Sequence, residues 1–245
     1  MVFLDRRIVL PSFSTPLEII PFGCVHADDS GFRESLWKEC VDRIIKTPNC
    51  YGVGLGDYKN LFRTHARMHL RSYTADETSW RELDDLIRRS AFEFAVKWLK
   101  PMGTKLLGLA EGNHFYTFQD GTTDTQYMCQ ILKVPYLEKP CFARLTIHIK
   151  SHQKDAVLKV LLHHGDWAAG YTKAGGDLNA IEAKGEGFLF DMYIFSHTHR
   201  KLGHKSPTLT IPEHGELRTI EIPRVFIRTG CFTATYDKCI TTYAQ

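Results

Sequence analysis

Short apolar runs that each end in a cluster of metal-binding residue types constrain this sequence more than any other feature. Five such clusters follow one another along the chain: Gly23-Cys24-Val25-His26, Gly56-Asp57, Gly112-Asn113-His114, His163-His164-Gly165 and Ser196-His197-Thr198-His199. The runs have the length of buried β-strands. Carboxylates, imidazoles and amide oxygens are ligands of the divalent metals that catalyse hydrolysis. The sequence therefore predicts one metal site, assembled at the ends of several strands.

Length and composition are those of an ordinary globular protein. With 245 residues, 43% hydrophobic and 24% charged, the chain is expected to form one domain, residues 1–245, around a large core. The net charge of +3 permits a phosphate-bearing partner without requiring one. No apolar stretch approaches the ~20 residues that span a bilayer, and the first ten residues lack the apolar run of a signal peptide. No membrane partner is expected.

The cysteines indicate a reducing compartment. There are seven, an odd number, and they form neither a CxxC motif nor a framework with disulfide-like spacing. We expect reduced thiols in a cytoplasmic protein.

Strand-like and helix-like segments alternate in the first half of the chain, whereas the second half is mostly strand-like. Strands are expected at residues 17–22, 51–55, 105–110, 143–149, 157–162, 192–195, 209–211, 217–222 and 225–228. Helices are expected at residues 32–46, 76–100 and 122–133. The pattern predicts an α/β (α+β) fold with sheets inside and helices outside. Ligands of open α/β sheets bind at the carboxyl ends of the strands, where all five clusters fall.

Each cluster has a simpler explanation when it is taken alone. Cys24 and His26 can point to the same side of a strand end and hold one metal, or they can be a buried thiol and a hydrogen-bonded imidazole. Asp57 can bridge two cations, or it can be an ordinary turn residue. His197 and His199 together are the hardest to explain without a metal.

The Gly-Asn-His and His-Gly clusters suggest a ligand set and a proton donor. The amide oxygen of Asn113 is a neutral ligand, and His114 can donate a proton near neutral pH. The alternatives are a capping Asn and a surface His. His164 can be a ligand or a satisfied polar residue. The aromatic residues that follow can stack on a nucleobase or pack in the core: Phe115, Tyr116 and Phe118.

Residues 59–71 are basic and lie beside Asp57 in the sequence. Arg63, Arg67 and Arg71 recur every four residues, so a helix would place them on one face. Guanidinium groups match phosphate oxygens, which makes this segment a candidate phosphate-binding flap. The alternative is a solvent-exposed helix face.

As a set, the motifs resemble those of the calcineurin-like metallophosphoesterase superfamily, especially small single-domain members from bacteria and phages. The resemblance runs from about Ile19 to the end of the chain. It includes Ala174-Gly175-Gly176 and Thr229-Gly230. It implies a four-layer fold, in which a two-sheet β-sandwich with mixed sheets is flanked by helices and holds a dinuclear metal site between the strand ends.

The resemblance also implies a role for each motif residue. The first metal would be surrounded by Cys24, His26, Asp57 and His199. The second metal would be surrounded by Asp57, Asn113, His164 and His197, with Asp57 as the bridge. His114 would be the catalytic residue over the substrate phosphate. We expect the substrate itself to contact Asn60, Arg63 and Arg67.

Three positions depart from the family pattern. Cys24 stands where the family usually has Asp, Asn60 stands where a second Asp is common, and Phe115 stands where an acidic residue usually follows the motif His. A thiolate is a softer ligand than a carboxylate, so Cys24 would shift the metal preference toward zinc or iron.

These features predict a metal-dependent hydrolase of phosphoric esters. We expect two divalent metal ions, with Mn²⁺ favoured and Mg²⁺, Zn²⁺ or Fe as alternatives, that activate a water molecule. The expected substrate is a phosphodiester in a nucleotide or in nucleic acid, DNA or RNA, which would make the protein a nuclease. The alternatives are a phosphomonoesterase, a hydrolase with a single metal, and a binding or scaffold module weakened by Cys24.

Overall fold

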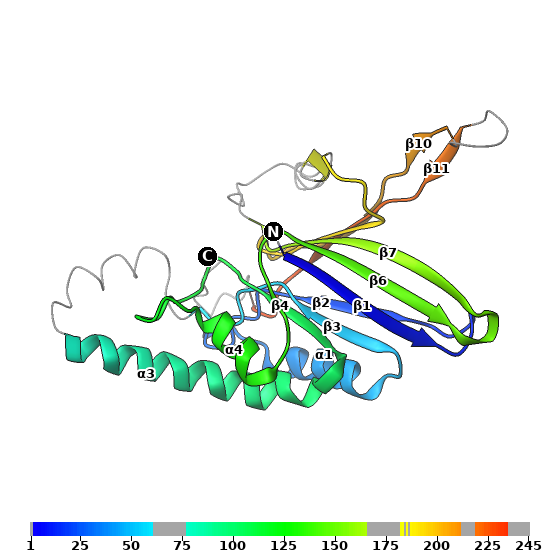
Figure 1. Ribbon diagram of the computed structural model, residues 1–245. Helices are drawn as coiled ribbons and strands as arrows, with labels where there is room; N and C mark the ends of the chain where they lie inside the picture. The colour runs from blue at the N-terminus through cyan, green and yellow to red at the C-terminus, as the bar shows by residue number, and fades with distance from the viewer. Residues whose placement is uncertain are drawn as a thin grey trace.

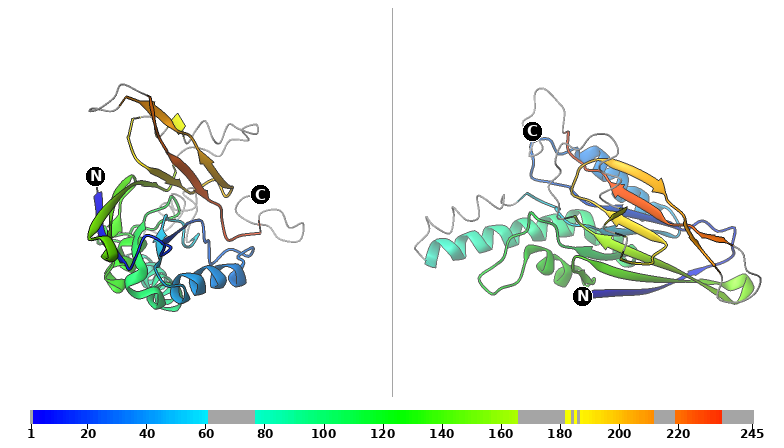
Figure 2. Two further views of the ribbon diagram at one scale, coloured as in Figure 1. Left: turned by 90° about the vertical axis from the view of Figure 1, so that its right-hand side faces the viewer. Right: turned by 90° about the horizontal axis from the view of Figure 1, so that it is seen from above.

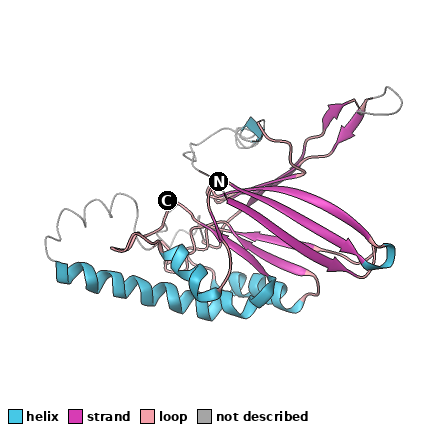
Figure 3. Cartoon of the chain, viewed as in Figure 1, coloured by secondary structure: helices cyan, strands magenta, loops and turns pink. Residues whose placement is uncertain are grey.

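Two β-sheets packed face to face, with helices against one of them, form the framework of the protein (Figures 1 and 3). The computed structural model describes residues 2–60, 77–165, 182–183, 185, 187–211 and 219–234. It confirms the expected α+β class. None of the helices in these ranges is long and apolar enough to cross a membrane.

The smaller sheet is parallel and is buried on both faces. Its strands, in order across the sheet, are β2 (Glu18–Phe22), β3 (Cys50–Gly54), β4 (Leu106–Ala110) and β5 (Tyr136–Leu137). Strands covered on both sides read as continuous apolar runs, which explains why the sequence predicts the first three to within about a residue.

The larger sheet is mixed and contains two strands that the sequence did not predict. Its order is β1 (Val2–Leu10), β6 (Cys141–Ile149), β7 (Lys154–His163), β8 (Met192–Phe195), β12 (Val225–Thr229) and β9 (Lys201–Lys205). The two missed strands, β1 and β9, are its edges. Both expose much of their length to solvent, so neither shows the apolar run that marks a central strand.

A separate hairpin extends from the larger sheet. It pairs β10 (Thr208–Thr210) with β11 (Ile220–Ile222) in antiparallel register. Figure 1 and the left view of Figure 2 place this hairpin and the helices on opposite sides of the molecule.

The helices pack on the outer face of the smaller sheet. They are α1 (Glu34–Lys46), α3 (Glu77–Phe94) and α4 (Asp124–Leu132). A core that includes Phe22, Trp37, Leu99 and Leu109 fills the space between them and the sheet. Lys105, just before β4, donates from Nζ to the carbonyl oxygens of residues 44, 45 and 47 at 2.8–2.9 Å. Its charge thereby satisfies the carbonyl end of α1.

The long helix expected at residues 76–100 ends earlier than its apolar pattern. α3 stops at Phe94, a π-helical turn follows over Ala95–Leu99, and a 3₁₀ segment covers Lys100–Lys105. Pro101 cannot continue the backbone ladder, and Gly103 has a φ of 55° that breaks the helix. By contrast, α4 lies within the predicted range 122–133, and a capping box between Thr123 and Gln126 marks its start.

The described residues show three of the expected four layers. Helices cover the smaller sheet, and a second core between the sheets includes Leu4, Val53, Leu107 and Ile194. On the far face of the larger sheet, aromatic rings such as Phe188 and Phe190 pack on Phe142. No helix of more than one turn covers that face within the ranges that the structure describes. A short 3₁₀ turn, Lys150–His152, joins β6 to β7.

Candidate metal centre

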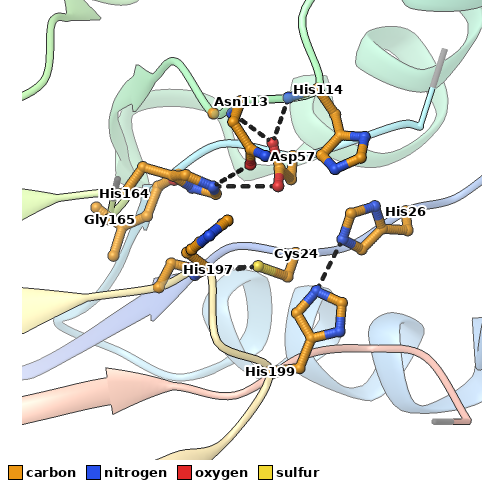
Figure 4. A network of polar contacts seen from close by, with 12 residues as sticks. Cys24, His26, Asp57, Asn113, His114, His164, Gly165, His197 and His199 are labelled. Atoms are coloured by element: carbon orange, nitrogen blue, oxygen red, sulfur yellow. Dashed lines mark hydrogen bonds and ion pairs between the residues drawn. The ribbon is translucent and has the colours of Figure 1, made fainter. Parts of the chain in front are cut away.

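The carboxyl ends of strands from both sheets meet at one end of the sandwich, and they bring the predicted ligands together (Figure 4). Cys24 and His26 follow β2, Asp57 follows β3, Asn113 follows β4, His164 follows β7, and His197 and His199 follow β8. Cys24, His26 and His164 are fully buried. Residues from seven positions over more than half of the chain thus share one site, as the sequence predicts.

The backbone at this site is strained. Positive φ angles occur at Cys24 (49°), His26 (47°), Asp57 (55°), His197 (73°) and His199 (58°). Such angles are uncommon for residues other than glycine and cost about 1–3 kcal/mol each. Within the described ranges eight residues other than glycine have them, and five of the eight are candidate ligands. Strained residues of this kind often cluster at active sites and ligand-binding sites.

Asp57 is held by two backbone donors. Its Oδ1 accepts hydrogen bonds from the N–H groups of Asn113 at 2.8 Å and His114 at 2.9 Å. A Cβ atom on Gly112 would lie 1.9 Å from this oxygen, so the close approach requires glycine. Burial opposes ionisation, but the imidazoles of His164, His26 and His114 outweigh it and hold the pKa of Asp57 well below its usual range. Asp57 is therefore a fixed carboxylate.

His164 is held at both ring nitrogens. Its Nδ1 donates to the carbonyl oxygen of Leu55 at 2.5 Å. Its Nε2 faces Asn113 Oδ1 at 2.9 Å and Asp57 Oδ2 at 3.1 Å. A proton on Nε2 or a bound cation would satisfy these two contacts, and all three atoms are of metal-binding type.

A second group of ligand atoms lies beside the first. Asn60 donates from Nδ2 to Asp29 at 3.0 Å, which turns its Oδ1 toward His26 Nδ1 at 2.7 Å. His26 therefore donates from Nδ1 and directs the lone pair of Nε2 at His199 Nε2, 3.1 Å away. The ligand atoms of Cys24, His26 and His199 all lie within 4.8 Å of one another.

Cys24 also belongs to the first group. Its Sγ lies within 4.8 Å of the ligand atoms of both Asp57 and His164. The same sulfur contacts Ser196 Oγ at 3.2 Å and accepts from the N–H of His197 at 3.3 Å. Burial raises the pKa of the thiol, so ionisation of Cys24 needs a nearby positive charge such as a metal ion.

His197 stands apart from the two tight groups. Its ring centroid lies 5.3 Å from that of His164. Burial, together with the neighbouring His164, lowers the pKa of His197 to about 4. Burial likewise lowers the pKa of His26 to about 4. Both rings are therefore neutral at physiological pH, the form that binds metals.

Two residues at the site were missed by the sequence analysis. Cys231 follows β12 as Gly230-Cys231, and a hydrogen bond joins it to His199. Burial opposes the charged ring, but the hydrogen bonds to Cys231 and Cys24 outweigh it and raise the pKa of His199 to about 10. Arg228, only 1% exposed, donates to Thr198 Oγ1 at 2.6 Å and so anchors the turn between the two histidines. For Cys231, the glycine-cysteine pair at a strand end was an available signal.

The remaining predictions have mixed outcomes. His114 is buried beside the ligands. Its ring lies edge-on to the ring of His26, and the two ring centroids are 5.3 Å apart. Tyr116 and Phe118 pack with Ile87 in the core, so for these two aromatic residues the packing alternative is correct. Asn60 contacts His26 and Asp29 and so supports a candidate ligand, while its expected contact with substrate stays a prediction.

Several predictions concern residues outside the described ranges. These are Arg63, Arg67, Arg71 and Ala174-Gly175-Gly176. Among the described cysteines none forms a disulfide, as expected.

The sequence was also compared with known proteins. No protein-family model matches it, and a search of curated proteins finds no match. The resemblance to metallophosphoesterases therefore rests on the motifs, and the function must be argued from the site itself.

Proposed function

We propose that this protein is a metal-dependent phosphoesterase that binds two divalent metal ions at the strand ends and hydrolyses a phosphodiester. One observation carries the proposal: two adjoining groups of ligand atoms, drawn from both sheets and mostly buried, are held by turns with strained backbone. Imidazoles, a carboxylate and an amide oxygen in this arrangement suit paired hydrolytic metals.

The donors fit such a pair. One metal would be held by Cys24, His26 and His199, and the other by Asp57, Asn113 and His164, with His197 beside it. The ring nitrogens and oxygens that lie 2.9–3.1 Å apart would each direct a lone pair at the cation once the ring protons between them are lost. Sulfur and imidazole ligands favour Zn²⁺ or Fe²⁺, which moves the preference away from the Mn²⁺ expected from the sequence.

Each residue then has a task in the reaction. The bound metals would supply an activated water and polarise the phosphoryl oxygens. Asp57 stays ionised and fixed because two backbone N–H groups hold it. His114 lies close enough to the ligands to protonate the departing oxygen, the usual task of a general acid. The net charge of +3 and the basic segment that follows Asp57 support a phosphodiester over a neutral substrate.

Metal add-back to stripped protein tests the proposal. Metal content and hydrolysis of bis-p-nitrophenyl phosphate and of the corresponding monoester would be measured after separate addition of Mn²⁺, Mg²⁺, Zn²⁺ and Fe²⁺. We expect about two metals per chain and turnover of the diester. Turnover of the monoester alone would make the protein a phosphomonoesterase. Bound metal without turnover would overturn the enzymatic proposal and favour a binding module, and failure to bind metal would overturn the centre.

A further inference from the structure

We infer that the thiolate of Cys24 is the ligand shared by both metal ions, in place of a centre bridged by Asp57 alone. The inference rests on the proposed function, because a bridge requires two metals. It changes what the sequence predicts, in which Cys24 serves only the first metal and Asp57 joins the two.

The position of the sulfur is the first argument. Among the described residues, Cys24 is the one that belongs to both groups of ligand atoms, whereas Asp57 belongs to one. Figure 4 shows Cys24 between the pair His26 and His199 on one side and the pair Asp57 and His164 on the other. Donors bound to one metal at about 2.0–2.3 Å lie at most about 4.6 Å apart. Groups that already fit within 4.8 Å need only a small contraction.

The backbone of Cys24 fixes the sulfur there. Its N–H donates to the carbonyl oxygen of Gly56 at 3.0 Å, and its own carbonyl accepts from the N–H of Phe232 at 3.1 Å. These bonds tie the end of β2 to the turn after β3 and to the segment after β12. The N–H of His197 points at the sulfur from the opposite sheet. Cys24 is thus the residue at which the two halves of the centre are joined.

The carboxylate of Asp57 has less capacity to bridge. Oδ1 already accepts two backbone hydrogen bonds, which leaves Oδ2, and Oδ2 faces His164 at 3.1 Å. A thiolate sulfur carries several lone pairs and forms longer bonds of about 2.3 Å, so one sulfur can reach two metals. A bridging thiolate would also make both positions favour borderline-soft ions such as Zn²⁺ or Co²⁺ over Mg²⁺.

Titration of the metal-free chain with Co²⁺ tests the inference without any activity measurement. A cobalt–thiolate bond gives a charge-transfer absorption in the near ultraviolet, and cobalt in any ligand field gives weaker visible bands. Bound cobalt would be counted by elemental analysis, with a phosphine in place of a thiol reductant. A bridging Cys24 predicts that the charge-transfer band grows through two equivalents, to about twice its value at one. A terminal Cys24 predicts that this band stops at one equivalent while the visible bands continue to grow.

Two variants assign the band to one sulfur. Cys24→Asp should bind cobalt through a carboxylate and lose the band. Cys231→Ser removes the neighbouring thiol that contacts His199, and it should keep the band through both equivalents. If Cys24→Asp fails to fold, the wild-type titration and Cys231→Ser still decide the question.

Each contrary result has a distinct meaning. Two bound cobalt ions with a band complete at the first would overturn the bridge and leave the proposed function standing. A band that survives in Cys24→Asp and disappears in Cys231→Ser would assign the thiolate to Cys231 and overturn the inference. Absence of cobalt binding would overturn the metal centre as well.

Discussion

The two ends of the β-sandwich are built from the same strands but differ in the burial of their polar side chains and in the surroundings of their strained residues. At the carboxyl ends of β2, β3 and β8, charged and polar side chains are buried and the backbone has positive φ. At the opposite end, pairs of polar side chains such as Arg43 with Glu18 and His148 with Asp155 are partly exposed to solvent. Positive φ there occurs at Asn49 and Gln153, where the chain simply turns. Strain with burial, rather than strain alone, therefore distinguishes the end that carries the candidate metal centre.

The largest effect is expected at Asp57. Asp57→Asn keeps the acceptor for the two backbone N–H groups but removes the charge that balances a metal. We expect turnover to fall by about 10³-fold or more, equivalent to about 4 kcal/mol, together with loss of metal. The measurement is kcat/KM with parallel metal analysis. Asp155→Asn at the opposite end is the matched control and should behave as wild type; a rate for Asp57→Asn within tenfold of wild type would contradict the assignment.

His114→Ala should have the next largest effect and should separate chemistry from metal binding. Removal of a general acid typically costs about 10²–10⁴-fold, and the loss should be greatest for diesters with poor leaving groups. Metal content should be unchanged, because the ligands remain. Rates would be compared for p-nitrophenyl and alkyl leaving groups. Equal losses on both would show that His114 does not protonate the leaving oxygen.

Asn60→Ala sharpens the comparison by disturbing a support of the site rather than a ligand. The Oδ1 of Asn60 accepts a hydrogen bond from His26 Nδ1 at 2.7 Å. Loss of a hydrogen bond that orients a metal ligand typically weakens metal affinity by about 10–100-fold. Asn60→Asp should retain or increase the affinity, because a carboxylate is the stronger acceptor. Competition with a metal-binding dye measures both variants. Unchanged affinity in Asn60→Ala would mean that His26 needs no such support.

The buried carboxyl of Asp124 offers a test of how much a buried charge costs in stability. Burial raises the pKa of this carboxyl to about 7, above its value in an unfolded chain. The folded protein therefore binds the proton more tightly, and stability from this group is present below about pH 4 and is lost as pH rises to about 7. Asp124→Asn can still accept the hydrogen bond from Tyr116.

The Asp124→Asn variant should therefore be more stable than wild type at pH 8, by on the order of 2 kcal/mol, and nearly equal to it at pH 4. Urea unfolding at the two pH values gives the difference. If variant and wild type differed equally in unfolding free energy at both pH values, the effect would not come from ionisation.

The smallest effect is expected at the exposed end. Arg43→Ala breaks the ion pair with Glu18, in which the arginine side chain is 62% exposed, and solvent screens such pairs strongly. The unfolding midpoint should stay close to wild type, and metal binding should not change. A large loss of stability would mean that the two ends of the sandwich are less different than their burial indicates.

Much of the fold could be read from the sequence because buried strands and amphipathic helices leave periodic patterns. The strands β3, β4 and β8 are central, and β2 is an edge strand of the smaller sheet. All four are covered on both faces and apolar, so their runs were visible. The edge strands β1 and β9 could not be recognised, because many of their side chains are exposed to solvent and polar and apolar residues are mixed along them. The early end of α3 was also hidden, since the π-helical segment Ala95–Leu99 is a single turn and too short to change the apolar period visibly.

The sequence by itself determined the kind of site, because glycine followed by Asp, Asn or Cys at the end of an apolar run is a local property of the chain. The tertiary structure decided which atoms meet. Only packing of the two sheets brings Cys24 within reach of both His199 and His164, places Cys231 beside His199, and turns Asn60 onto His26. These contacts join residues up to 175 positions apart, from Cys24 to His199. No local spacing records them, because they depend on how the strand ends are aligned across the sandwich.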